Sequence, residues 1–145
     1  MSKTNTWETG LLELLFTNTT FAGVGDATGL PGAATAGSLY FSLHTSDPGE
    51  AGDQTTNECT YTSYARVAVA RSGSGWTVTG NAVAVDADVT FPGGTGGSGT
   101  ATHWGLGTDS SGAGKLLYKG AISPTIVTGS GVTPQLTAGT AVTED

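Results

Sequence analysis

Short segments in which apolar and polar residues alternate, separated by glycine-rich turns, restrict this chain to a β-rich fold. In Ser38–His44 the apolar side chains of Leu39, Phe41 and Leu43 alternate with polar ones, which is typical of a strand with one buried face. Gly80-Asn81 lies between two such segments and predicts a two-residue hairpin turn. Further candidate strands are 64–71, 76–79, 82–85, 88–91, 101–108 and 115–122, with weaker signals at 125–127 and 132–136. About eight short strands at this spacing favour a β-sandwich, a jelly roll or a small barrel.

One helix is expected near the N-terminus. Asn5 is followed three residues later by Glu8, a variant of the capping box that predicts Asn5 as the N-cap residue. Apolar residues then recur at spacings of three and four, which places them on one helical face: Trp7, Leu11, Leu14 and Leu15. A short helix with this face needs a cover, which is either the protein's own sheet or another subunit.

The 145 residues are expected to form a single domain, because this length can bury a sizeable core without division. Within the domain 1–145, residues 1–22 form an N-terminal helix or arm and residues 38–136 form the β-sandwich. The stretch between them is rich in glycine and alanine and is expected to be a loop.

Composition and charge disfavour several classes of partner. The net charge is −7 and lysine plus arginine total 5, whereas phosphate backbones are bound by clusters of these residues, so direct nucleic-acid binding is not expected. No apolar run approaches the roughly 18 residues of a membrane span, so no membrane partner is expected. The N-terminus lacks the hydrophobic region of a signal peptide, which predicts synthesis in a cytoplasm. The one cysteine, Cys59, is expected to be a loop or core residue rather than a reactive thiol.

The segment after the first candidate strand brings His44, Asp47 and Glu50 close together in sequence. These residues could supply a catalytic base with its acid or three metal ligands, but the other histidine, His103, lies in a separate predicted strand. A strand-ending turn at Asp47-Pro48-Gly49 accounts for the same residues more economically. No G-x-S-x-G elbow is present, and a hydrolase that uses His44 or His103 is therefore the weakest hypothesis. No catalytic residue, metal or cofactor is assigned from the sequence.

An ordered set of motifs resembles a family of phage proteins. The set comprises SLHTSDPGEAG, YTSYARVAVAR, GWTVTGN, FPGGTGGSGT, THWGLGT and GKLLYKG, and it runs from about Ser38 to Ile122. In this order the motifs resemble the small capsid cement (decoration) proteins of tailed bacteriophages, which are sometimes labelled tail-fibre proteins. The resemblance implies an all-β fold, a jelly-roll-like antiparallel β-sandwich with a short N-terminal α-helix.

The same resemblance implies a non-enzymatic structural protein on the exterior of a capsid. Its partner would be the major capsid protein, and it would bind there as a homo-oligomer, a dimer or trimer, stabilising contacts between capsomers after synthesis in the host cytoplasm. The expected partner-contact residues are those of the helix face: Trp7, Leu11, Leu14 and Leu15. The alternative label implies a tail-fibre or adhesin module that binds host-surface glycans, for which the candidate aromatic residues are Trp76, Trp104 and Tyr118.

Overall fold

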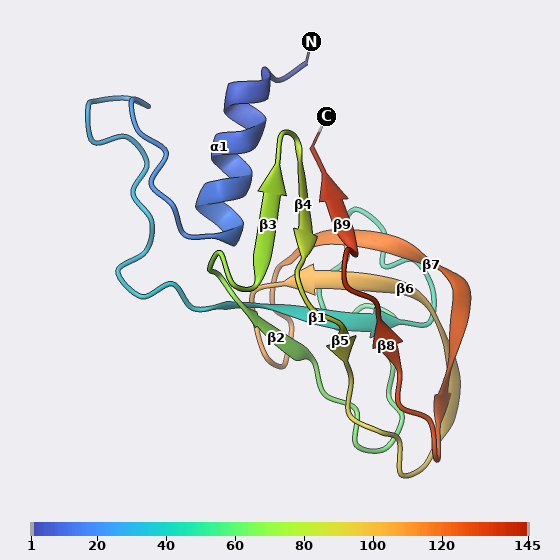
Figure 1. Cartoon of the computed structure of the whole chain (residues 1–145). Coiled ribbons are helices and arrows are strands. Elements are labelled where there is room, and N and C mark those ends of the chain that lie inside the picture. Colours follow the sequence, from blue (N-terminus) through green and yellow to red (C-terminus); the bar gives the residue numbers. More distant parts are fainter. Residues whose placement is uncertain (1, 145) are drawn as a thin grey trace. The chain divides into compact units, whose positions relative to one another are not determined.

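The computed structural model describes residues 2–144, and this part of the chain contains one helix and nine strands (Figure 1). The elements in chain order are α1 (Asn5–Phe16), β1 (Ser38–His44), β2 (Val67–Ala70), β3 (Trp76–Thr79), β4 (Ala82–Val85), β5 (Val89–Thr90), β6 (Ser98–Gly107), β7 (Leu116–Gly129), β8 (Gln135–Leu136) and β9 (Ala141–Thr143). The pairings β1–β6, β6–β7, β3–β4, β4–β9 and β5–β8 are all antiparallel. The expected fold class, an all-β antiparallel sandwich with a short N-terminal helix, is confirmed.

The predicted start of the helix is wrong by one residue. Thr4 is the N-cap residue and makes no side-chain capping hydrogen bond, so Asn5 does not cap the helix. The backbone N–H groups of Trp7 and Glu8 instead donate to the Thr4 carbonyl. The main chain satisfies these donors where the sequence pattern predicted a side chain.

The C-terminal half of the sheet structure extends beyond the predicted strands. β6 begins at Ser98, three residues before the predicted strand 101–108, and β7 continues to Gly129 because its second half pairs with that extension. β9 was not predicted, since three residues give little alternation to detect. It forms because Val142 pairs with Val83 on β4 and both side chains are buried. Long-range pairing therefore decided these boundaries.

The chain divides into two compact units, each assembled from separate segments. The first unit contains residues 1–38, 70–88 and 137–145, and the second contains residues 39–69 and 89–136. The first unit holds α1 and the β3–β4–β9 sheet. The second holds most of the β2–β1–β6–β7 sheet and the β5–β8 pair.

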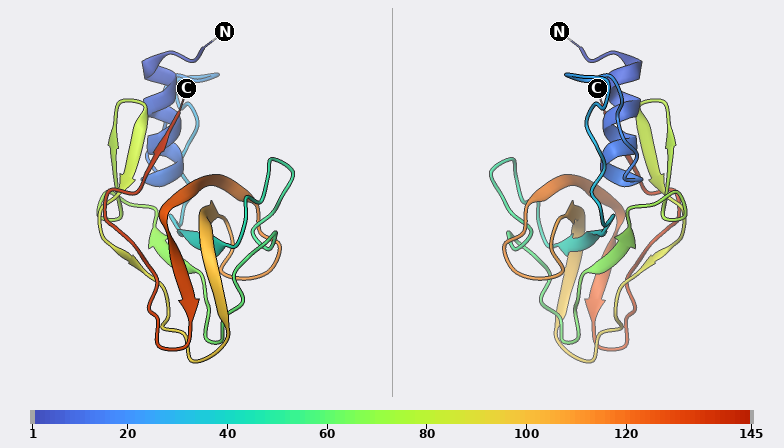
Figure 2. Two further views of the ribbon diagram at one scale, coloured as in Figure 1. Left: turned by 90° about the vertical axis from the view of Figure 1, so that its right-hand side faces the viewer. Right: turned by 90° about the vertical axis from the view of Figure 1, so that its left-hand side faces the viewer.

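In the first unit, α1 packs beside the β3–β4 hairpin (Figures 1 and 2). Leu12 and Phe16 are buried on its inner face, and the Phe16 ring meets the Trp76 ring edge-on at 4.7 Å between centroids. The Gly80-Asn81 hairpin turn is confirmed, and the Gly80 carbonyl accepts a hydrogen bond from Thr9 Oγ1 on the helix. Aromatic packing and this hydrogen bond together hold the helix to the hairpin.

Gly10 leaves room for the Phe21 ring, which belongs to the segment after the helix, to pack against the helix backbone. A Cβ atom at Gly10 would lie 2.5 Å from the Phe21 ring, a distance that side chains do not tolerate. The Phe21 ring also packs against Trp7 at 5.4 Å between centroids. The glycine weakens the helix by about 1 kcal/mol relative to alanine, but it lets Phe21 approach the helix backbone.

Arg71 binds the carbonyl end of α1, where the last helical turn contains no basic residue. Its Nη2 donates to the Leu14 carbonyl at 2.7 Å, its Nε donates to the Leu15 carbonyl, and its Nη1 donates to the Ala36 carbonyl at 2.9 Å. The last four carbonyls of a helix lack intrahelical partners and carry partial negative charge. One guanidinium therefore caps the helix and fixes the loop that leads into β1.

In the second unit, aromatic side chains pack across the sheet. Phe41 of β1 meets Trp104 of β6 edge-on at 5.8 Å between centroids. Gly120 of β7 lies opposite Trp104, and a Cβ there would come within 2.6 Å of the indole ring. The missing side chain lets the indole cover the neighbouring strand, as aromatic residues do beside glycine in sheets.

Replacing Arg71 with methionine is expected to lower the free energy of unfolding by about 2 kcal/mol, because carbonyls at the helix end lose a charged donor. Chemical denaturation monitored by tryptophan fluorescence measures the change. Lys115→Met is the matched control, since it removes the same charge from an exposed residue. Equal stability of the two variants would contradict the capping role of Arg71.

Candidate functional site

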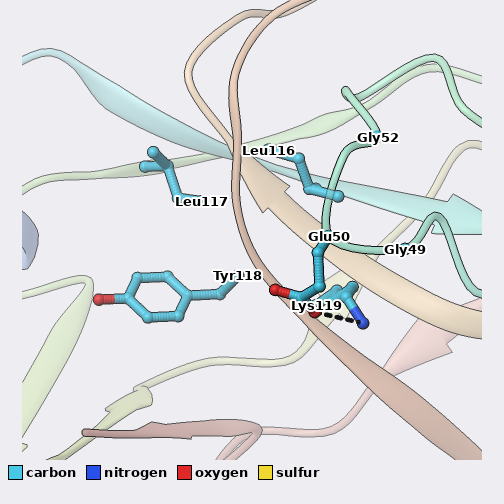
Figure 3. Close-up of a pocket in the computed structure, with 7 residues that line it drawn as sticks. All are labelled: Gly49, Glu50, Gly52, Leu116, Leu117, Tyr118 and Lys119. Atoms are coloured by element: carbon cyan, nitrogen blue, oxygen red, sulfur yellow. Dashed lines mark ion pairs between the residues drawn. The ribbon is translucent and has the colours of Figure 1, made fainter.

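The segment 47–52, called the corner below, is held against β7 by an ion cluster (Figure 3). Lys119 Nζ lies 3.0 Å from Asp47 Oδ1 and 3.2 Å from Glu50 Oε1. Asp47 Oδ1 also accepts a hydrogen bond from the Gly49 N–H at 2.8 Å, and Gly49 has φ 74°. The predicted turn is confirmed, and the structure adds Lys119, which lies 72 residues from Asp47 in the chain.

The corner and the start of β7 enclose a shallow pocket of about 280 Å³. Its lining residues are Gly49, Glu50, Gly52, Leu116, Leu117, Tyr118 and Lys119. Figure 3 shows the Tyr118 ring pointing away from the Glu50–Lys119 pair, on the other side of the β7 backbone. The ring and the charged groups therefore do not face a single ligand position.

The charges of this cluster are fixed rather than tuned for proton transfer. The hydrogen bond to Asp47, followed by that to Glu50, raises the pKa of Lys119 above its ordinary value. The backbone N–H of Gly49, followed by Lys119, lowers the pKa of Asp47. Both shifts favour the charged forms, whereas a general acid or base works best with a pKa near the operating pH.

His44 is a buried structural histidine. Its Nδ1 lies 2.8 Å from the Thr56 carbonyl, so Nδ1 carries the proton and donates, and Nε2 accepts from Ser42 Oγ at 2.8 Å. Burial lowers the pKa of His44, and this outweighs the opposing effect of the Thr56 carbonyl. A Cβ at Gly105 would lie 2.5 Å from Nε2 and 2.7 Å from Ser42 Oγ. The Ser42–His44 pair resembles a nucleophile and base, but the fold leaves no space beside it for a substrate.

The structure brings the two histidines closer than the sequence suggested. His44 and His103 are directly opposite each other on β1 and β6. His103 Nδ1 is bonded to Thr102 Oγ1 at 2.9 Å rather than to His44. Within residues 2–144, no group of three or more His, Cys, Asp or Glu side chains is arranged to hold a metal ion.

A buried ion pair that the sequence did not indicate lies beneath the turn at 109–112. Arg66 binds both carboxylate oxygens of Glu58, at 2.7 and 2.8 Å, and its side chain is 2% exposed. The same guanidinium donates to the carbonyls of Asp109 and Gly112, and Tyr64 OH donates to Glu58. Local spacing gave no signal for the cluster, because the turn it holds is more than forty residues from Arg66.

The residues proposed for sugar stacking are mostly inaccessible. Trp76 is 2% exposed and Trp104 is 8% exposed, so both indoles belong to the cores of their units. Tyr118 alone of the three is half-buried rather than buried. The glycan-binding alternative required solvent-facing aromatic side chains, and the two tryptophans do not meet that requirement because their large apolar area is used in packing.

The predicted partner-contact face of α1 is only partly covered. Trp7 is 38% exposed and is one of two large apolar side chains exposed in residues 2–144. Leu11, Leu14 and Leu15 are half-buried, whereas the helix buries Leu12 and Phe16 completely.

Cys59 is a core residue, as expected. It is buried, and burial raises the pKa of its thiol to about 11, so the reactive thiolate is scarce near neutral pH. Among the described residues, no helix has the length and apolar character needed to span a bilayer.

Comparison with known proteins gives one family. Residues 2–143 match a family described as Podophage GP4 fiber I protein gp80, so the match covers nearly the whole chain. No curated protein matches the chain.

Breaking the buried ion pair should cost far more stability than breaking the exposed cluster. Arg66→Met is expected to reduce the free energy of unfolding by about 3 kcal/mol, because Glu58 is left with an uncompensated charge. Lys119→Met changes the same charge at the exposed corner and should have a much smaller, salt-dependent effect. Urea denaturation at two salt concentrations measures both, and similar losses would contradict the distinction.

The stability of the protein should fall with a His44-dependent slope as the pH drops below about 6.5. The unfolded chain takes up the proton near that pH, whereas buried His44 resists it because its pKa is lowered. The slope reaches at most about 1.4 kcal/mol per pH unit and fades above about pH 7.5, where the histidine is neutral in both states. His44→Asn should remove this slope in denaturation measured from pH 7 to 5, whereas His103→Asn, the control, should retain it. An unchanged slope in His44→Asn would refute the assignment.

Proposed function

This chain belongs to the podophage GP4 fiber I protein gp80 family, and from that premise we propose that it is a subunit of a podophage fibre. The family match also makes the chain a structural protein of a phage virion. The resemblance noted in the sequence placed the chain among phage virion proteins, and the family match agrees with that part. The family match does not specifically support a capsid cement protein. The family match over residues 2–143 carries the proposal.

The chemistry of the described residues supports a structural role. The polar clusters connect distant segments: Lys119 with the corner, Arg66 with the turn at 109–112, and Arg71 with the helix end. Each cluster satisfies its charges internally, which favours rigidity over reactivity. A structural fibre protein of this kind is not typically an enzyme.

We place the attachment surface on the α1 face made of Trp7, Leu11, Leu14 and Leu15. Trp7 supports this choice because its ring is exposed and is held in position by Phe21. Aromatic side chains with little freedom to move are favoured as anchors at protein interfaces. The partner on this surface would be a neighbouring virion protein.

Capsid cement is the second candidate, since the same helix face could bind the major capsid protein. The two functions predict different copy numbers in purified particles. A fibre subunit would be present in few copies at the tail, whereas a cement protein would be present in many copies over the head. Quantitative mass spectrometry of separated heads and tails distinguishes them, and a chain confined to the heads would overturn the fibre proposal.

Trp7→Ala is expected to reduce incorporation of the protein into particles at least about fivefold, because an aromatic anchor at the centre of an interface contributes more than about 1 kcal/mol to binding. Quantitative immunoblotting of particles assembled with the variant measures incorporation. Thr6→Ala, an exposed neighbour outside the proposed face, is the matched control. Equal incorporation of the two variants, with unchanged thermal unfolding, would refute the proposed attachment surface.

A further inference from the structure

β7 is an edge strand with one unpaired side. Its sheet has the order β2–β1–β6–β7, and β7 pairs with β6 along Leu116–Gly129. In the part of the chain that the structure describes, no strand pairs with the opposite side of β7. Figure 2 shows β6 and β7 running together as two long ribbons. The unpaired side of an edge strand presents backbone N–H and C=O groups that can accept another strand.

The two halves of β7 differ in how they are covered. The first half lies against the corner, where Lys119 binds Asp47 and Glu50. The second half carries exposed side chains at alternate positions: Ala121, Ser123, Thr125 and Val127. Val127 is 64% exposed. Within residues 2–144, Val127 and Trp7 are the two exposed large apolar side chains.

The exposed part of β7 lacks most of the features that protect sheet edges. Natural edge strands are shielded by charged residues, by proline or by short length. Gly120–Gly129 contains no ionisable side chain, and Pro124 is its single protective residue. β2 at the other edge of the sheet has four residues, whereas β7 has fourteen. β7 is therefore the longer and less protected edge.

We propose that the 120–127 edge of β7 binds the same edge of a second copy of this chain, antiparallel and about a twofold axis. A net charge of −7 on each copy makes most approaches between copies repulsive. Along 120–127 this repulsion is locally absent, because the segment carries no charge. An antiparallel edge is also self-complementary, since a twofold axis that pairs residue i of one strand with residue j of the other copy also pairs residue j with residue i.

The exposed side chains suit this pairing. Threonine and valine are favoured in strands, and pairs of hydroxyl-bearing and β-branched residues across neighbouring strands stabilise a sheet. The sheet of each copy would continue into the other, giving a sheet of eight strands from two sheets of four. This assembly is separate from the α1 attachment surface, so it can fail or succeed independently of the fibre proposal.

Analytical ultracentrifugation of the full chain tests the proposal over a range of concentrations. We expect a monomer–dimer equilibrium, and Val127→Lys should raise its dissociation constant at least about tenfold, because lysine on an edge opposes strand pairing. Ala68→Lys is the matched control, since it places the same charge on an exposed residue of β2, the other edge strand. It should leave the dissociation constant unchanged. Thermal unfolding verifies that both variants are folded.

Single cysteines at 121, 123, 125 and 127 locate the axis, since Cys59 is buried and does not compete. At least one of them should form a disulfide-linked dimer under mild oxidation, and the same substitution at Ala68 should not. A monomer at every concentration would overturn the proposal. The proposal would also be overturned if Ala68→Lys and Val127→Lys raised the dissociation constant of the dimer equally. Assembly into oligomers larger than a dimer through the β2 edge would overturn it as well. Binding of a different virion protein by a monomer, sensitive to Val127→Lys, would also overturn the second copy as the occupant.

Discussion

The first unit depends on the placement of one guanidinium at the carbonyl end of α1. Arg71 binds the carbonyls of Leu14, Leu15 and Ala36, and so satisfies acceptors that the helix sequence leaves without a basic partner. The helix is short and contains Gly10, so its own propensity is insufficient for stability. Packing of Phe16 on Trp76 supplies the apolar contact. Arg71 donates hydrogen bonds to backbone carbonyls at the end of that helix, which would otherwise lack partners when the helix packs.

The second unit repeats this principle with buried polar groups that join strands to loops. Arg66 and Glu58 neutralise each other while Arg66 holds the turn at 109–112. His44 connects Ser42 with the Thr56 carbonyl. Groups that resemble catalytic pairs in the sequence are thereby committed to structure, because a buried polar atom without a partner is costly. The surfaces that remain available for function are exposed apolar side chains and an unpaired strand edge.

A structural virion protein needs surfaces rather than a reactive cleft, and the two exposed apolar residues Trp7 and Val127 lie on different elements. A β-sandwich can serve many functions, so the fold does not distinguish a fibre from a capsid location. Family membership identifies the chain as a structural protein of a phage virion. The two binding surfaces proposed above, on the helix face and on β7, each contain one of these exposed residues.

Local patterns in the sequence determined most strand positions, the Gly80-Asn81 hairpin and the turn at Asp47-Pro48-Gly49, because each depends on residues adjacent in the chain. They also indicated the apolar face of α1, but not that Leu12 and Phe16 would be its buried members. Only the tertiary structure decided that Lys119 reaches Asp47, that Arg71 caps α1 and that Trp76 and Trp104 are buried. These outcomes depend on segments far apart in sequence. The spacing of neighbouring residues predicts local elements, but it does not indicate which distant segments will form favourable contacts.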